Sequence, residues 1–176
     1  MTAPREFDVT APDLRRAWLL PGAALLLGLV GVLVAAHEEP RTLWILAVLA
    51  LAAGLIHLSI ARRAVVLDRE GLRIRAGINA LRVPVDAIDL ASAAVIEPAQ
   101  HPGLRPVIKT FGTAMPGYQA GHFRLRDRGR AFVLLTGPGK VVLLPLRDGK
   151  RVLLSLRHPE SLLQALRDMA PGAARR

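Results

Sequence analysis

The chain has 176 residues, with 24 lysines and arginines against 14 aspartates and glutamates, and it contains no cysteine. The lack of cysteine excludes a disulfide-stabilised scaffold, a cysteine-ligated zinc or iron–sulfur centre and a thiol nucleophile. Apolar residues make up 52% of the chain, which is too high a fraction for a disordered protein.

Two long apolar segments lie near the N-terminus. Residues 17–36 carry no charge, and His57 is the sole titratable group of residues 43–61. At about 1.5 Å per helical residue each segment spans about 30 Å, the thickness of a hydrocarbon core. We therefore expect a transmembrane hairpin over 17–61 between an N-terminal segment 1–16 and a domain over 62–176. A signal peptide cleaved near Ala35-Ala36 is the alternative, which the length of the run and the second span disfavour.

The charges at the ends of these segments predict their orientation. Arg15 and Arg16 precede the first segment, and Arg62 and Arg63 follow the second, whereas the link 37–42 holds one arginine and two glutamates. Positive charge near a span favours the cytoplasmic side. We expect a multi-pass protein of the plasma (inner) membrane with both termini in the cytoplasm.

Small residues are spaced three and four apart along both segments, and such faces let membrane helices approach closely. They predict either the seam of the hairpin or a surface for homo-oligomers, and the sequence does not separate the two. His57 has no acidic partner in either span, so we expect it to face the seam in a structural role. The expected seam consists of Ala24, Gly28, Gly31, Ala35, Ala47, Ala50, Gly54 and His57.

The remainder of the chain is basic and rich in short alternating runs. Residues 62–176 hold 20 basic and 9 acidic side chains, a net charge of +11. A brief helical turn is expected at 86–89, a long loop at 98–121, and an amphipathic helix at 159–170. The pattern favours antiparallel strands in a small barrel or two packed sheets, capped by the C-terminal helix. The expected strands are 64–69, 72–76, 81–85, 90–97, 122–127, 130–136, 140–147 and 150–156.

Several stretches suggest a family. A two-span hairpin followed by AVVLDREGLRIRAG and LRVPVDAIDL resembles the bacterial membrane-anchored proteins that carry a pleckstrin-homology-like (PH) domain. The run TFGTAMPGYQAGHFRLRDRGRAFVLLT and the ending LLSLRHPESLLQAL are similar to one branch of those families. The resemblance covers nearly the whole chain and implies a membrane-anchored α+β protein. Its β-barrel would be capped by a C-terminal helix, and no catalytic residues are implied.

Enzymatic and nucleic-acid-binding patterns are weak. The five histidines are scattered without metal-ligand spacing, and Gly137-Pro138-Gly139-Lys140 lies between expected strands instead of opening a helix. We therefore expect no enzyme, no metal and no cofactor. Because the basic region has few aromatic side chains for base stacking, we also expect no nucleic-acid partner.

Arginines in two strands are candidate contacts for anionic lipid headgroups. Arg124 and Arg126 alternate with Phe123 and Leu125, so the arginines share one face while the apolar pair faces the core. Near a membrane each such cation contributes about 1 kcal/mol of attraction. A second, looser cluster resembles the basic cluster of phosphoinositide-binding PH domains and consists of Arg69, Arg73 and Arg75.

The expected loop 98–121 is the other candidate site. Its polar residues suggest a rim for a protein partner; they are His101, Arg105, Lys109 and Tyr118. In the alternative interpretation Gly112, Gly117 and Gly121 supply tight turns and Tyr118 packs on the barrel.

These patterns predict a non-enzymatic membrane protein that presents a basic PH-like binding or scaffolding domain to anionic lipids of the inner leaflet. The alternative is an accessory subunit of a larger membrane complex, which docks a protein partner through the barrel edge or the loop.

Overall fold

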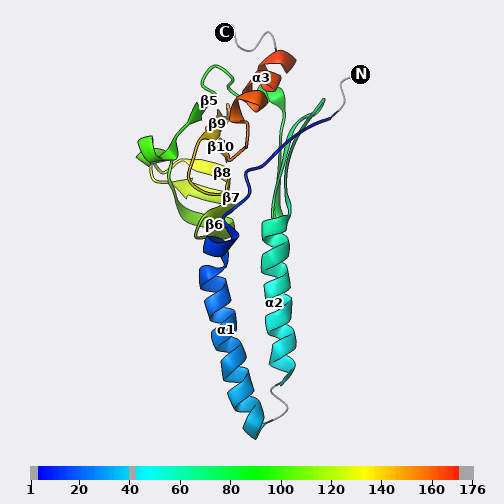
Figure 1. Cartoon of the computed structure of the whole chain (residues 1–176). Coiled ribbons are helices and arrows are strands. Elements are labelled where there is room, and N and C mark those ends of the chain that lie inside the picture. The colour runs from blue at the N-terminus through cyan, green and yellow to red at the C-terminus, as the bar shows by residue number, and fades with distance from the viewer. Residues whose placement is uncertain (1–3, 40–42, 171–176) are drawn as a thin grey trace.

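A computed structural model describes residues 4–39 and 43–170. A β domain sits at one end of a pair of helices that run side by side, and the first and last described elements, β1 and α3, both lie at the domain end (Figure 1). In chain order the elements are β1 (Arg5–Phe7), α1 (Leu14–Glu38), α2 (Trp44–Ala61), β2 (Arg63–Asp68), β3 (Gly71–Ala76), β4 (Asn79–Val83), β5 (Ala94–Ile96), β6 (Pro106–Met115), β7 (Tyr118–Leu125), β8 (Arg130–Leu135), β9 (Val141–Pro145), β10 (Arg151–Leu154) and α3 (Pro159–Met169).

The two expected apolar helices are confirmed. Helix α1 begins three residues before the apolar run because the Asp13 carboxylate accepts hydrogen bonds from the backbone N–H groups of Arg15 and Arg16. Within the described residues, two helices are long and apolar enough to cross a membrane, and only 6% and 11% of their most apolar windows are buried. A core helix of a soluble protein would bury most of that surface.

The expected seam of small residues is wrong except at Gly28. A Cβ on Gly28 would stand 3.2 Å from Leu49, and Val32 is buried in the same seam. The predicted residues do share a face of each helix, but most of that face is exposed and does not contact the other helix. The exposed members of the expected seam are Ala24, Gly31, Ala35, Ala47, Ala50, Gly54 and His57.

The first sheet has the order β1-β2-β3-β4, and its neighbouring strands are antiparallel. Strand β1 was not expected from the sequence. It pairs with β2 in the register Phe7↔Val65, and the Phe7 side chain is buried in the core. The residues before α1 therefore complete a sheet that otherwise follows α2.

The second sheet has the order β5-β9-β10-β8-β7-β6. The Asp148-Gly149 hairpin joins β9 to β10 as expected, but it inserts β10 beside β8, and these two strands run parallel. The expectation of purely antiparallel strands is therefore wrong at this pair. The expected strand 90–97 shortens to β5.

The expected loop at 98–121 is also wrong beyond its first residues. Short 3₁₀ turns occupy Pro98–Gln100 and Pro102–Leu104, and then β6 forms a hairpin with β7. Gly112 and Gly121 lie opposite each other in this hairpin with φ angles of +139° and +119°. A Cβ on either glycine would collide with the other strand, so the backbone here requires glycine.

The main core lies between the two sheets and is closed by α3. Leu162 and Leu166 of α3 are fully buried in it, as the amphipathic pattern predicts. A second cluster, on the other face of the second sheet, contains Phe123 and Leu125. Phe123 and Leu125 are therefore buried as predicted, but they face the second cluster, whereas the arginine face of β7 contributes Tyr118 and Ala120 to the main core.

A joint fixes the β domain to the end of α2. The Tyr118 hydroxyl donates a 3.1 Å hydrogen bond to the Ser59 carbonyl oxygen, and the Ser59 and Thr113 hydroxyls lie 3.1 Å apart. The Gly77 N–H donates to the Arg62 carbonyl at 2.7 Å. Burial raises the pKa of the Tyr118 phenol. These contacts tie β3, β6 and β7 to the last turn of α2.

Candidate functional site

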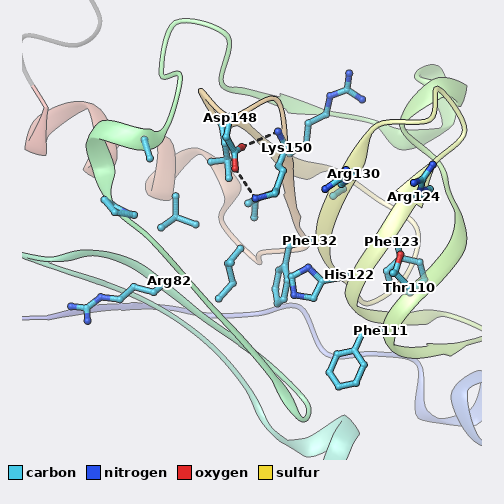
Figure 2. A pocket seen from close by; sticks show the side chains of 18 residues that line it. Arg82, Thr110, Phe111, His122, Phe123, Arg124, Arg130, Phe132, Asp148 and Lys150 are labelled. Carbon is cyan, nitrogen blue, oxygen red and sulfur yellow. Dashed lines mark hydrogen bonds and ion pairs between the residues drawn. The ribbon is translucent and has the colours of Figure 1, made fainter.

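A cleft of about 590 Å³ opens where the first sheet ends and the second continues (Figure 2). Strand β4 is the last strand of the first sheet, so nothing from that sheet covers the inner face of the second sheet beyond it. Along that face of β7, Tyr118 and Ala120 are buried, whereas His122 and Arg124 are exposed. The cleft is therefore the open side of the β domain.

The floor of the cleft is apolar. Phe132 of β8 and Val152 of β10 are buried beneath it, and Leu81 and Val83 of β4 form the opposite wall. The His122 ring meets the Phe132 ring edge to face, with centroids 5.0 Å apart. This floor can accommodate the apolar part of a ligand.

Two arginines stand over this floor on neighbouring strands. Arg124 of β7 and Arg130 of β8 are directly opposite in the register, where Cα atoms lie about 4.5–5.5 Å apart. Among the described residues no carboxylate forms an ion pair with either guanidinium. Like charges opposite each other destabilise a sheet. An anion bound between them would relieve that repulsion.

The other charged groups of the cleft lining are already paired. The Lys150 ammonium donates to Asp148 at 2.7 Å, and this hydrogen bond, with that of the Lys150 N–H, lowers the pKa of the Asp148 carboxyl. Arg151 pairs with Asp127 outside the lining. Desolvation opposes ionisation of Asp127, but the Gly129 N–H and Arg151 outweigh it and lower the pKa of that carboxyl. Arg124 and Arg130 therefore supply the uncompensated positive charge.

Sequence reasoning singled out one of these two arginines. Arg124 lies in the cleft lining, whereas Arg126 is exposed in the turn that follows β7 and does not line it. Arg130, His122 and Lys150 also line the cleft and were not predicted as site residues. Arg130 opens the expected strand 130–136, but only the strand register places it opposite Arg124.

The second basic cluster lies on the outer face of the first sheet. Arg69, Arg73 and Arg75 line a shallow hollow of about 620 Å³ that also contains three carboxylates, those of Glu6, Asp68 and Glu70. Arg73 pairs with Asp68 at 2.7 Å and with Glu70 at 2.9 Å. Arg69 lies at the far end of β2, about 20 Å along that strand from α2. The three arginines of this hollow are balanced by three carboxylates, and the β2–β3 turn that holds Arg69 is far from the end of α2. The hollow is therefore a weaker candidate than the cleft for binding an anionic headgroup.

The residues of the expected partner-binding loop do not come together. Tyr118 is buried in the joint, which agrees with the alternative interpretation that it packs on the barrel. Lys109 is exposed near the start of β6, Arg105 directly precedes that strand, and the His101 ring contacts the Glu97 carbonyl oxygen; Tyr118 lies across the turn at the other end of β6. Within the described residues, moreover, no group of three or more histidines, aspartates or glutamates is arranged to hold a metal ion.

A comparison with protein families agrees with this architecture. The model of the bacterial PH domain matches residues 63–170, from β2 to the end of α3. No curated protein and no solved structure matches the chain. Because the match covers more than half of the chain, the protein belongs to the bacterial PH domain family, preceded here by two helices long enough to span a membrane.

Proposed function

We propose that this protein is a membrane-anchored binding module whose cleft holds the anionic headgroup of a lipid at the cytoplasmic face of the plasma membrane. Helices α1 and α2 cross the bilayer, and the β domain binds without chemistry of its own. The observation that carries the proposal is the Arg124–Arg130 pair, which shares an open cleft and lacks a described counter-charge.

The ends of the helices indicate on which side of the membrane the β domain lies. Because β1 pairs with β2, the segment before α1 and the segment after α2 must lie on one side of the membrane, which two crossings satisfy. The arginines at this end are Arg15, Arg16, Arg62 and Arg63, and positive charge next to a span favours the cytoplasm.

The chemistry of the cleft favours a phosphate-bearing ligand with an apolar part. A guanidinium donates paired hydrogen bonds to phosphate or carboxylate oxygens, and each charged hydrogen bond is worth about 1.5–3 kcal/mol. The buried Phe132 and Val152 offer the apolar part a floor. The alternative function is the docking of a protein partner, which is favoured by the free edges of β4 and β6 beside the cleft.

The test uses the full chain in nanodiscs of uncharged phosphatidylcholine. Three probes are added below their micellar concentrations: short-chain phosphatidylglycerol, short-chain phosphatidylcholine and inorganic phosphate. We expect saturable, salt-sensitive binding of phosphatidylglycerol, weaker binding of phosphate and none of phosphatidylcholine. Arg124→Gln and Arg130→Gln should each weaken binding about tenfold or more.

Arg69→Gln is the matched control, because it removes the same charge from an exposed site outside the cleft. Equal losses in Arg69→Gln and Arg130→Gln would mean general surface attraction and would overturn the cleft proposal. Binding of an acidic peptide but not of phosphatidylglycerol would reject the lipid and support the docking function instead.

A further inference from the structure

The exposed apolar side chains of the β domain are not scattered. Apart from α1, α2 and the residue Leu43 that precedes α2, the large apolar residues that are exposed in the described chain are Ile78, Val107, Ile108, Phe111 and Met169. Apart from Met169 on α3, all of them lie on the β3–β4 turn or on β6. We call Ile78, Val107, Ile108 and Phe111 the apolar edge.

The apolar edge continues the bare surface of α2. Ile78 is 72% exposed and shares a hollow of about 310 Å³ with Leu55 and Leu58 of α2 and with Met115 of β6. The hollow also contains Arg62, the first residue after α2. Ile78 therefore lies level with the last turn of the helix, at the depth where a bilayer changes from hydrocarbon to headgroups.

Strand β6 extends this surface sideways. In Figure 1, β6 is the strand of the second sheet next to the helices, and the strands up to β5 are stacked beyond it. Thr113 of β6 contacts Ser59 of α2, and Phe111 follows about 7 Å farther along the strand. Figure 2 shows the Phe111 ring pointing away from the other labelled side chains of the cleft. Phe111 is 59% exposed, and the exposed Lys109 lies beside it.

We infer that the apolar edge rests in the interfacial layer of the bilayer and seats the β domain on the lipid surface. The partner is the membrane, because the surface is continuous with lipid-facing α2 and because each part of the edge has a basic residue beside it. Lys109 lies between Ile108 and Phe111 in β6, and Arg62 lies in the hollow of Ile78. The long stems of such side chains can reach to headgroups. The rigid joint at Ser59 holds the edge at this depth. The inference shares with the proposed function only the premise that α1 and α2 span the membrane.

Seating of β6 has a consequence for the cleft. Strands in a sheet are about 4.8 Å apart, so Arg124 of β7 and Arg130 of β8 would stand about 5 and 10 Å above the edge. The Debye length at physiological salt is about 8 Å, so Arg124 would stand within one Debye length of the headgroups and Arg130 slightly beyond it. The edge would therefore bring the cleft arginines within reach of anionic lipid.

The absence of cysteine from the chain makes the test direct. Single cysteines are introduced into the full chain as Ile78→Cys and Phe111→Cys, with Arg69→Cys and Met169→Cys as exposed controls away from the edge. Each carries an environment-sensitive fluorophore in phosphatidylcholine nanodiscs. Quenching is compared between lipids with a nitroxide near the headgroup and a water-soluble quencher.

We expect lipid-borne nitroxide to quench positions 78 and 111 at least threefold more than positions 69 and 169, with the reverse order for the aqueous quencher. Aqueous quenching at 78 and 111 equal to the controls would overturn the inference. Protection of these positions from both quenchers would also overturn it, because a protein partner or a second copy would then cover the edge.

The experiments distinguish a failure of this inference from a failure of the proposed function. Arg124→Gln with Arg130→Gln should abolish phosphatidylglycerol binding and leave the quenching pattern unchanged. If phosphatidylglycerol binding is retained but positions 78 and 111 show the quenching of the controls, only the membrane contact of the apolar edge is rejected. If the quenching pattern is as expected but phosphatidylglycerol does not bind, only the lipid site in the cleft is rejected.

Discussion

Removal of one cleft arginine should stabilise the empty protein while it weakens anion binding. Two guanidinium groups about 6 Å apart in water repel by about 0.7 kcal/mol, and like-charged pairs directly opposite in a sheet cost about 0.2–1 kcal/mol. Arg130→Gln removes this repulsion from Arg124, which has no described counter-charge. We expect a gain of about 0.5 kcal/mol, or about 2–3 °C in the unfolding midpoint of a domain of this size.

The assay is thermal unfolding of the full chain in uncharged nanodiscs, followed by near-ultraviolet circular dichroism at about 10 mM and about 1 M salt. The gain should be largest at low salt and should vanish at high salt, where the Debye length falls to about 3 Å. Saturating phosphatidylglycerol should reverse the order, because ligand at about 100 times Kd stabilises the wild type by about 2.7 kcal/mol.

Arg69→Gln is again the control, because its neighbours are carboxylates and its removal should give no gain. A lower midpoint for Arg130→Gln at low salt would refute the reasoning. A gain that persists unchanged at high salt would refute it too, since the cause would then be packing and not charge.

Three further predictions concern the fold. Gly139 has φ +135° and lies in open space, so Gly139→Ala should lower the free energy of unfolding, measured with denaturant, by about 1–3 kcal/mol. Gly121→Ala should lower it by about 1–3 kcal/mol more, because the new Cβ would lie 2.4 Å from backbone of β6. Equal losses in the two variants would contradict the close approach. Tyr118 is the single tyrosine, so absorbance near 295 nm reports its ionisation, which should begin only above the usual pKa of about 10. Because the pKa is raised in the folded protein, the free energy of unfolding should fall once the pH exceeds about 10. Titration at the usual pH would mean that Tyr118 is not buried in the joint. Asp127→Asn should lower the free energy of unfolding at pH 7, because the pKa of Asp127 is lowered in the folded protein and its carboxylate pairs with Arg151. The difference in unfolding free energy between variant and wild type should shrink as the pH falls below about 4, where the carboxyl becomes protonated. A difference that does not change with pH would contradict the ion pair with Arg151.

Periodicity predicted the elements whose pattern is regular. The alternation of Arg73 and Arg75 around Ile74, and of Arg124 between Phe123 and Leu125, matches the observed faces of β3 and β7. Pro84, which directly follows β4, has no N–H to donate to a sheet, and β4 is an edge strand of the first sheet. These predictions succeed because in each of these segments the apolar side chains are buried and the arginines are exposed.

Strands β1 and β6 could not be predicted in this way. Strand β1 is three residues long, too short for periodicity, and its partner follows a distant helix. In β6 the register shifts between Pro106 and Ile108 and again between Lys109 and Phe111, and Gly112 interrupts the pattern. The sequence signal of a strand disappears where bulges and glycines provide curvature.

The cleft depends on register, which is a property of the turn. A two-residue turn at Arg128-Gly129 would place Asp127 opposite Arg130, whereas the observed turn starts earlier and has Arg128 at φ +68°, which brings Arg124 opposite Arg130. The ion pairs that neutralise Arg73 likewise depend on side chains brought together by the β2–β3 hairpin. Composition predicted a basic domain but not which of its charges stay uncompensated.

The pairing of β1 with β2 has a consequence for biosynthesis. Strand β1 leaves the ribosome first, yet its partner is made only after both apolar helices. If α1 and α2 cross the bilayer as proposed, β1 can pair with β2 only after both helices have inserted. In that case a chain with only one inserted helix would have β1 and β2 on opposite sides of the membrane, and Phe7 could not reach the core in which it is buried.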